Sequence, residues 1–275
     1  MSIDPLRRPR LESTTTMPIE LVLSTIAAEL SRTLGAELLG LYVHGSWVVG
    51  DFAPQRSDLD LLAVLSCEPD ESLLEGLAVA HLHIEAVHAA WKGRVEVEYV
   101  ALETVRGFAA APREADGPAI ARISPGEPLH LLPASLHRLL TWATVRDTGR
   151  PLAGPPAVDL LPVIHSDDAR AAALEHVRDW PTWVQRMTMP GGQAYAVLSL
   201  CRALHLFTEG GHISKREAAD HAAAALPEWS PLINWARCWW YAGGRDDENT
   251  RLADSTRFVN EVSARILAGE APPRH

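Results

Sequence analysis

The chain has 275 residues, and its 35 acidic and 25 basic side chains give a formal net charge of −10 at pH 7. Proteins that coat nucleic acid or dock on anionic membranes need excess positive charge, so this balance argues against both kinds of partner. With 47% hydrophobic and 22% charged residues, the composition is globular, and the length suits one large domain or two ordinary ones.

The N-terminal stretch and the cysteines predict a cytoplasmic protein. Residues 1–17 carry arginines with no apolar segment behind them, so we expect a flexible tail and not a secretory signal. No apolar run is long enough to cross a bilayer. Cys67, Cys201 and Cys238 are widely separated and lack CxxC spacing, which favours buried free thiols in a reducing compartment. We expect the protein to be a monomer.

Helices and strands alternate in the predicted first half of the chain. Residues 19–34 have apolar side chains at helical spacing, and the apolar stretch 38–46 ends in a Gly-Ser pair, as a buried strand running into a turn does. Residues 58–66 read as the next strand, 71–90 as a helix, and 94–103 as a strand with strict alternation. This order predicts an α/β domain.

The second half is predicted to be helical. Residues 136–146 read as a helix, and the Pro-rich stretch 155–166 is the candidate boundary. Beyond it four segments have amphipathic helical spacing: 167–186, 193–208, 214–225 and 250–267. Ser214 and Glu217 form a predicted capping box at the start of the third. We therefore divide the chain into the tail, an α/β domain at 18–158 and an all-α domain at 159–275.

The most informative segment contains Asp58 and Asp60. Residues two apart on a strand point to the same face, so the two carboxylates lie side by side at the start of a buried strand. Two such carboxylates repel unless a cation lies between them, and hard oxygen ligands favour magnesium. Taken alone, the Asp-x-Asp pattern favours the simpler interpretation, two exposed acids at the entrance of a strand.

The neighbouring residues favour a phosphate site. Gly45 allows backbone N–H groups to approach a phosphate, and the hydroxyls of Ser46 and Ser57 add donors. On the later strand, Glu96 and Glu98 share one face. The simpler alternative is a strand with one wet face. Two strands with inward acids beside a Gly-Ser turn nevertheless form a site for a metal-bound triphosphate.

The combination of Gly-Ser, Asp-x-Asp and a later strand carboxylate resembles the nucleotidyltransferase superfamily. Within it, nearly the whole chain after the tail is similar to the streptomycin/spectinomycin aminoglycoside adenylyltransferases. The similar segments are LYVHGSWVVGDFAPQRSDLDLLAVL, RVEVEYV, LTWATVRDTGRPLAGP and AVLSLCRALHLFTEGGHISKREAADHAAAALPEW.

This resemblance implies a nucleotidyltransferase-fold α/β domain and a helical domain that closes the active-site cleft. ATP would be the co-substrate, and a cationic small molecule, an aminoglycoside or aminocyclitol antibiotic, would accept AMP. Asp58, Asp60 and Glu96 would hold magnesium, with two ions expected, and Glu96 would also be the general base. Ser46 and Ser57 would contact the triphosphate.

The resemblance also assigns Arg202 and Lys215 to the phosphates, although each reads from the residues alone as a surface charge. Lys92 and Lys215 are the only lysines in the chain. Glu98 is a second-choice base whose expected role is behind the site or in solvent, and Glu127 is a further candidate to assist.

Two departures from the family concern the acceptor. Pro128 follows Glu127 where the family commonly has a tryptophan expected to contact streptomycin, and the stretch TMPGGQAY lacks the family's drug-binding acids. Two alternatives therefore stay open: a nucleotidyltransferase with another acceptor, such as a metabolite, protein or RNA, and a non-catalytic nucleotide-binding module.

The aromatic residues of the second half and His44 are given structural roles. Four tryptophans could form a platform for bases, but their spacing around one helix favours packing: Trp229, Trp235, Trp239 and Trp240. His44, beside the Gly-Ser pair, is expected to pack or to form a hydrogen bond there.

Overall fold

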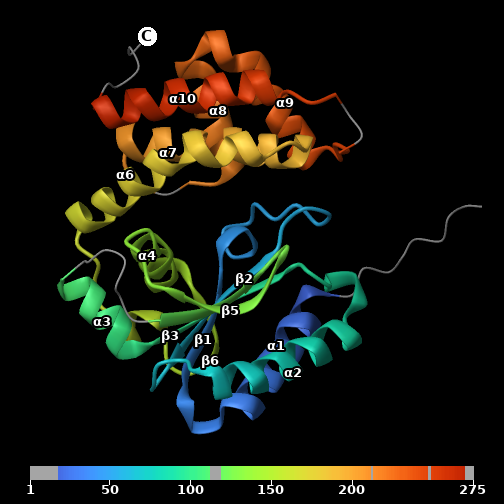
Figure 1. Cartoon of the computed structure of the whole chain (residues 1–275), viewed down its shortest axis with the longest axis vertical. Helices are drawn as coiled ribbons and strands as arrows, with labels where there is room; N and C mark the ends of the chain where they lie inside the picture. The colour runs from blue at the N-terminus through green and yellow to red at the C-terminus, as the bar shows by residue number, and fades with distance from the viewer. Residues whose placement is uncertain (1–17, 112–118, 212, 247–248, 270–275) are drawn as a thin grey trace, which may run out of the picture.

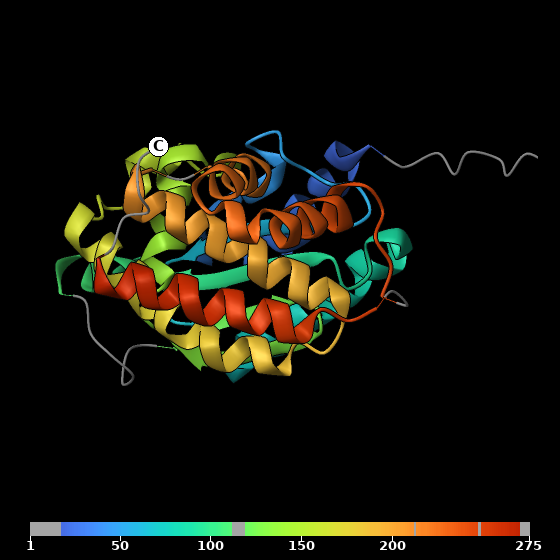
Figure 2. The same cartoon turned by 90° about the horizontal axis from the view of Figure 1, so that it is seen from above.

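The computed structural model describes residues 18–111, 119–211, 213–246 and 249–269. The predicted tail at 1–17 lies outside the described residues. Within them the chain forms an α/β domain followed by a helical domain, as expected, and Figure 1 shows the helical domain stacked on one end of the α/β domain. Viewed from above in Figure 2, the helices α7 (Pro190–Thr208) and α10 (Leu252–Ala268) run across the α/β domain.

The α/β domain is built on one mixed sheet with the strand order β5-β4-β3-β2-β1-β6. The strands are β1 (Leu38–His44), β2 (Leu59–Leu65), β3 (Val95–Ala101), β4 (Ala119–Ser124), β5 (Glu127–Pro133) and β6 (Arg150–Ala153). Only β2 and β3 pair in parallel among the described strands, and the crossover between them is the helix α2. The central strands are buried on both faces, which is why their sequences read as continuous apolar runs.

Helices cover both faces of the sheet (Figure 1). The helices α1 (Ile19–Leu34) and α2 (Glu71–Val87) pack on one face, where the leucines of α1 meet the apolar residues of β1 and β2. The helices α3 (Leu102–Ala110), α4 (Arg138–Thr148) and α5 (Ala157–Leu160) pack on the other face around the buried Trp142.

The helical domain has a single apolar core. Its helices are α6 (Ser166–Trp183), α7 (Pro190–Thr208), α8 (Lys215–Ala225), α9 (Ser230–Tyr241) and α10 (Leu252–Ala268). The helix α7 lies at the centre and contacts α8, α9 and α10. The capping box predicted at Ser214 and Glu217 is confirmed, since both of its hydrogen bonds form. The four tryptophans pack against this core, as predicted.

Several elements of the α/β domain do not appear in the sequence-based prediction. These are α3, the hairpin of β4 and β5, the short edge strand β6, and α5, which lies where the sequence predicts a domain boundary. The expectation that all three cysteines are buried is wrong for two of them: Cys201 is buried, but Cys67 and Cys238 are exposed, and all three are free. Among the described helices, none is long and apolar enough to traverse a bilayer.

Candidate active site

Gly45 and Asp60 touch where β1 ends and β2 begins. Gly45 opens a 3-10 turn (Gly45–Trp47) with φ of +70°, and the adjoining His44 pairs with Asp60 in the antiparallel register of β1 and β2. A Cβ atom added to Gly45 would lie 2.2 Å from Oδ2 of Asp60. Glycine is therefore needed here for two reasons, the left-handed backbone and the close approach of a carboxylate. Ser46 follows in the same turn.

The parallel pairing of β2 and β3 brings the predicted acids together. Asp60 pairs with Glu96 across the two strands, and Asp58 immediately precedes β2. Burial first, and then the charge of Asp60, raises the pKa of Asp58 to about 7. Burial and the charge of Glu96 raise the pKa of Asp60 likewise to about 7. The three carboxylates form one electrostatic cluster, which a cation would relieve.

His44 lies beside this cluster but does not neutralise it. Burial lowers its pKa to about 4, although the charges of Glu98 and Glu96 act in the opposite direction. At neutral pH the imidazole is therefore uncharged.

Arg122 is a site residue that the sequence interpretation missed. It comes from β4, and its Nε and Nη2 atoms lie 3.0 and 2.9 Å from Oε1 of Glu96. Its Nη1 atom lies 3.3 Å from Oε2 of Glu127, whose carboxylate also accepts a hydrogen bond from Ser124. The guanidinium thus fixes one carboxylate oxygen of Glu96. Only the pairing of β4 with β3 creates this contact, because the two residues are 26 positions apart.

Glu98 is not on a wet face, so the simpler reading of this strand is wrong. It is only 3% exposed. Its Oε2 accepts a hydrogen bond from Nη1 of Arg138 at 2.9 Å, and its Oε1 accepts one from Nε1 of Trp142 at 2.7 Å. Both partners are on α4. Glu98 therefore connects β3 to α4 through buried hydrogen bonds and lies behind the acidic cluster.

The loop between the Gly-Ser turn and β2 is held in a fixed shape. Ser57 is buried, and its Oγ accepts a hydrogen bond from the backbone N–H of Ala53 at 2.9 Å. Arg94 donates from Nη2 to the backbone carbonyls of Pro54 and Ser57 at 2.8 and 2.5 Å. The Ser57 hydroxyl thus braces the loop, and its role toward a phosphate stays a prediction.

The helical domain supplies cations that face the acids. The charges of Lys215 and Arg202 act on Asp60 and lower its pKa, against burial and Glu96. The Lys215 Nζ atom lies 4.6 Å from the ring centroid of Tyr195 and 4.3 Å from that of Trp240. Burial, and then Arg202, lower the pKa of Lys215 to about 8. Residues more than 140 positions apart in sequence thus interact electrostatically across the two domains.

The donor set of this cluster fits magnesium. Within the described ranges, no three or more His, Cys, Asp or Glu side chains form a group that could hold a metal ion. Magnesium in nucleotide-dependent enzymes is commonly held by one or two carboxylates together with substrate phosphates. Asp58 and Asp60, adjoining a turn that can receive phosphates, match that pattern.

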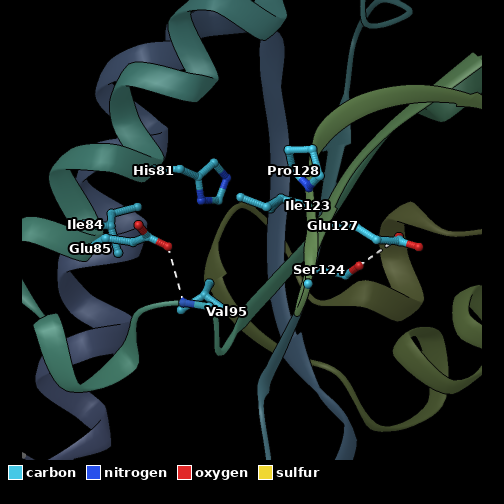
Figure 3. A pocket seen from close by; sticks show the side chains of 10 residues that line it. His81, Ile84, Glu85, Val95, Ile123, Ser124, Glu127 and Pro128 are labelled. Atoms are coloured by element: carbon cyan, nitrogen blue, oxygen red, sulfur yellow. Dashed lines mark hydrogen bonds between the residues drawn. The ribbon is translucent and has the colours of Figure 1, made fainter. Parts of the chain in front are cut away.

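A small pocket lies on the other side of the sheet (Figure 3). It is lined by His81, Ile84 and Glu85 of α2 and by residues around the turn of the β4 and β5 hairpin, including Pro128. The side chains of β3 alternate, so Val95 faces this pocket whereas Glu96 faces the acidic cluster. The pocket therefore opens on the opposite face of β3 from Glu96, although Glu127, which lines it, also contacts Arg122.

Comparisons with known proteins agree with this description. Residues 159–265 match the family model described as "Aminoglycoside adenylyltransferase, C-terminal domain". The chain is similar to the crystal structure of spectinomycin adenyltransferase AAD(9) from Enterococcus faecialis with ATP and spectinomycin. The TM-score is 0.72 and the sequence identity 19%, over 90% of this chain and 98% of that one. No curated protein sequence matches the chain. The family match covers the helical domain, and the structural likeness shows the two-part fold.

Proposed function

Because the helical domain matches that of the aminoglycoside adenylyltransferases and the whole chain has the fold of one of them, we propose that this protein transfers AMP from ATP to a hydroxyl of an aminoglycoside or aminocyclitol antibiotic. Such a transfer would confer resistance. One observation carries the proposal: Asp58, Asp60 and Glu96 form a half-buried cluster that interacts electrostatically with Lys215 and Arg202 of the helical domain.

The proposed reaction is an in-line displacement at the α-phosphorus of ATP. The acceptor hydroxyl oxygen forms a bond to this phosphorus, the bond to the oxygen bridging toward the β-phosphorus breaks, and pyrophosphate leaves. Glu96 takes the hydroxyl proton. Arg122 holds its Oε1 atom, so we assign Oε2 to the proton.

Asp58 and Asp60 would hold magnesium together with the phosphates of ATP, and Glu96 would lie beside them as the base. When bound, the metal neutralises charge on the phosphates. The N–H groups of the turn at Gly45 and Ser46 would contact the triphosphate from the sheet side. Lys215 and Arg202 would contact it from the helical side.

The acceptor is the part of the proposal with a specific alternative. At Pro128 and along residues 188–195 the chain departs from the family pattern for drug contacts. These departures favour an acceptor with few amino groups. The same site would also serve a metabolite, protein or RNA hydroxyl.

The experiment is incubation of the protein with labelled ATP, Mg²⁺ and a panel of antibiotics that includes streptomycin and spectinomycin. We expect labelled drug and pyrophosphate with at least one member, and loss of both in Glu96→Gln. Pyrophosphate release only after addition of cell extract would favour another acceptor. Unchanged activity in both Asp58→Asn and Glu96→Gln would refute the catalytic assignment.

A further inference from the structure

Asp51 joins the two domains at a point that neither the family pattern nor the reaction explains. It lies in the loop between Gly45–Trp47 and β2, the light-blue segment that rises toward the helical domain in Figure 1. Its side chain is 9% exposed. The Oη atom of Tyr241 donates a hydrogen bond to its Oδ2 at 2.6 Å, and Nε of Arg216 lies 3.4 Å from its Oδ1.

Both partners of Asp51 come from the helical domain and are themselves in contact. Arg216 is in the first turn of α8, and Tyr241 is the last residue of α9. The Arg216 guanidinium stacks 3.9 Å from the centroid of the Tyr241 ring. Asp51 therefore binds a preassembled pair of donors and not two independent surface groups.

The same two helix ends carry the cation of the cleft. Lys215 precedes Arg216 in sequence, Trp240 precedes Tyr241, and Lys215 Nζ lies over the Trp240 ring. The charge of Asp51 also reaches Lys215, where it acts together with those of Asp60 and Asp58. The adjoining ends of α8 and α9 thus bind Asp51 and also place the ammonium group of Lys215 where it interacts with Asp58 and Asp60.

The loop that carries Asp51 transmits this contact to the acids. Ser46 stands at one end of the loop and Asp58 at the other, and Arg94 fixes its backbone beneath. A second contact repeats the attachment, since the Arg56 guanidinium lies 3.9 Å from the ring centroid of Trp239 on α9. A displacement of α8 and α9 would therefore change the position of Asp58.

We propose that Asp51 is a positioning residue for the nucleotide site. By binding Arg216 and Tyr241 it fixes the separation between the ammonium of Lys215 and the carboxylates of Asp58 and Asp60, which is the space that receives the triphosphate. The identification of the ligand as a triphosphate rests on the proposed function. The effect of Asp51 on the position of Lys215 does not depend on that function, and it is tested separately.

The first measurement is the KM and the Kd for ATP in Asp51→Ala and Tyr241→Phe. Losing a hydrogen bond to a charged group corresponds to roughly a tenfold effect. We expect the KM and the Kd to rise by about tenfold in Asp51→Ala, with kcat changed less than threefold, and a smaller rise in the same direction for Tyr241→Phe. Asp51→Glu is expected to restore part of the affinity.

The matched control is Asp220→Ala. Asp220 of α8 pairs with Arg237 of α9, so the same two helices are joined by an ion pair for which the described part of the α/β domain shows no partner. This variant is expected to leave the ATP constants unchanged. Equal effects of Asp220→Ala and Asp51→Ala, or no effect of Asp51→Ala, would overturn the proposal.

The second measurement needs neither catalysis nor nucleotide. Because Lys92 and Lys215 are the only lysines, reductive ¹³C-methylation labels just these two side chains and the N-terminal amine for NMR. We expect Asp51→Ala to shift the Lys215 signal and its titration midpoint, while the Lys92 signal stays in place as an internal control. An unmoved Lys215 signal would overturn the proposal even in an active enzyme. A shifted Lys215 signal in a protein that transfers no AMP would contradict the proposed function but would leave the positioning role of Asp51 intact.

Discussion

Gly45 is the residue at which the backbone and the acidic cluster are most tightly coupled. Its φ of +70° disfavours any side chain, and the space that a Cβ would take is occupied by the Asp60 carboxylate. Gly93 offers a matched comparison, since its φ of +66° is nearly the same and nothing lies within 4 Å of its virtual Cβ. Comparing substitutions at the two glycines therefore distinguishes the effect of backbone strain from the effect of a clash with the Asp60 carboxylate.

We predict that Gly45→Ala abolishes AMP transfer, whereas Gly93→Ala retains it. Both should lose about 1–2 kcal/mol of unfolding free energy from the strained backbone, with a further loss in Gly45→Ala from the clash with Asp60. Urea unfolding and initial rates measure the two effects. Equal activity of the two variants would contradict the assignment of Gly45 to the site.

The raised pKa values of Asp58 and Asp60 make a prediction about stability. Both lie at about 7 in the folded protein, above the ordinary value of 3.8. Between about pH 4 and 7 the folded state therefore binds more protons than the unfolded state, and their contribution to stability falls as the pH rises.

Asp60→Asn should remove its part of this loss. We expect the difference in unfolding free energy between the variant and wild type to favour the variant by roughly 1 kcal/mol more at pH 8 than at pH 5. This value is discounted for the partial exposure of the carboxylate. Thermal unfolding at the two pH values checks it. The exposed Asp254, paired with Arg257 at its surface, is the control, and Asp254→Asn should show the same difference at both pH values.

At the scale of elements, the strand β3 carries two glutamates on the same face, and they have different roles. Glu96 faces the cluster with its Oε1 held by Arg122, and Glu98 is enclosed by Arg138 and Trp142 of α4. Removing one partner of a buried ion pair leaves the other charge uncompensated, which typically costs about 3–5 kcal/mol.

The paired substitutions Glu96→Gln and Glu98→Gln should therefore give opposite results. We expect Glu96→Gln to lose activity by at least about a hundredfold without loss of stability. Glu98→Gln should lose stability and keep most of its activity per folded molecule. Chemical unfolding and rates at low temperature distinguish them. A stable but inactive Glu98→Gln would reassign the base.

The elements recovered from the sequence are those with strong local patterns. The helix α1, the apolar strands β1 and β2 and the alternating β3 were predicted within a few residues, and so were Asp58, Asp60 and Glu96 as a cluster. The hairpin of β4 and β5 has a mixed pattern, and β6 is only four residues long, so neither carries a clear period.

The missed site residues depend on non-local pairing. Arg122 reaches Glu96 only because β4 pairs with β3, and Asp51 meets Tyr241 across 190 positions of sequence. No spacing rule marks a lone arginine or a lone aspartate. The burial of Glu98 was equally invisible, because the strand pattern gives its face but not the helix that covers that face.

At the scale of the whole molecule, the candidate site exists only where the two domains meet. Lys215 brings the ammonium to acids of the other domain, and its pKa of about 8 makes its charge sensitive to mildly alkaline conditions. As the pH rises through this value, Lys215 loses its proton and its attraction for phosphate.

We predict that the affinity for ATP falls as the pH rises through about 8. Lys215→Arg keeps the charge and should flatten this dependence, and Lys215→Ala should weaken binding by about tenfold at pH 7. Calorimetric titrations between pH 7 and 9.5 provide the measurement. Lys92→Ala serves as the control and should match wild type. A pH-independent wild-type affinity would remove Lys215 from the phosphate contacts.

The edge strand β6 has a consequence for how the protein is made. Its residues Arg150–Ala153 pair with β1, which begins at Leu38, so the sheet is completed only when a segment more than a hundred residues later returns to it. During synthesis from the N-terminus, β1 keeps an open edge until β6 has left the ribosome. The α/β domain therefore reaches its final form shortly before the first turns of α6 emerge, and the helical half of the active site, carried by α7 and α8, is completed against an already formed sheet.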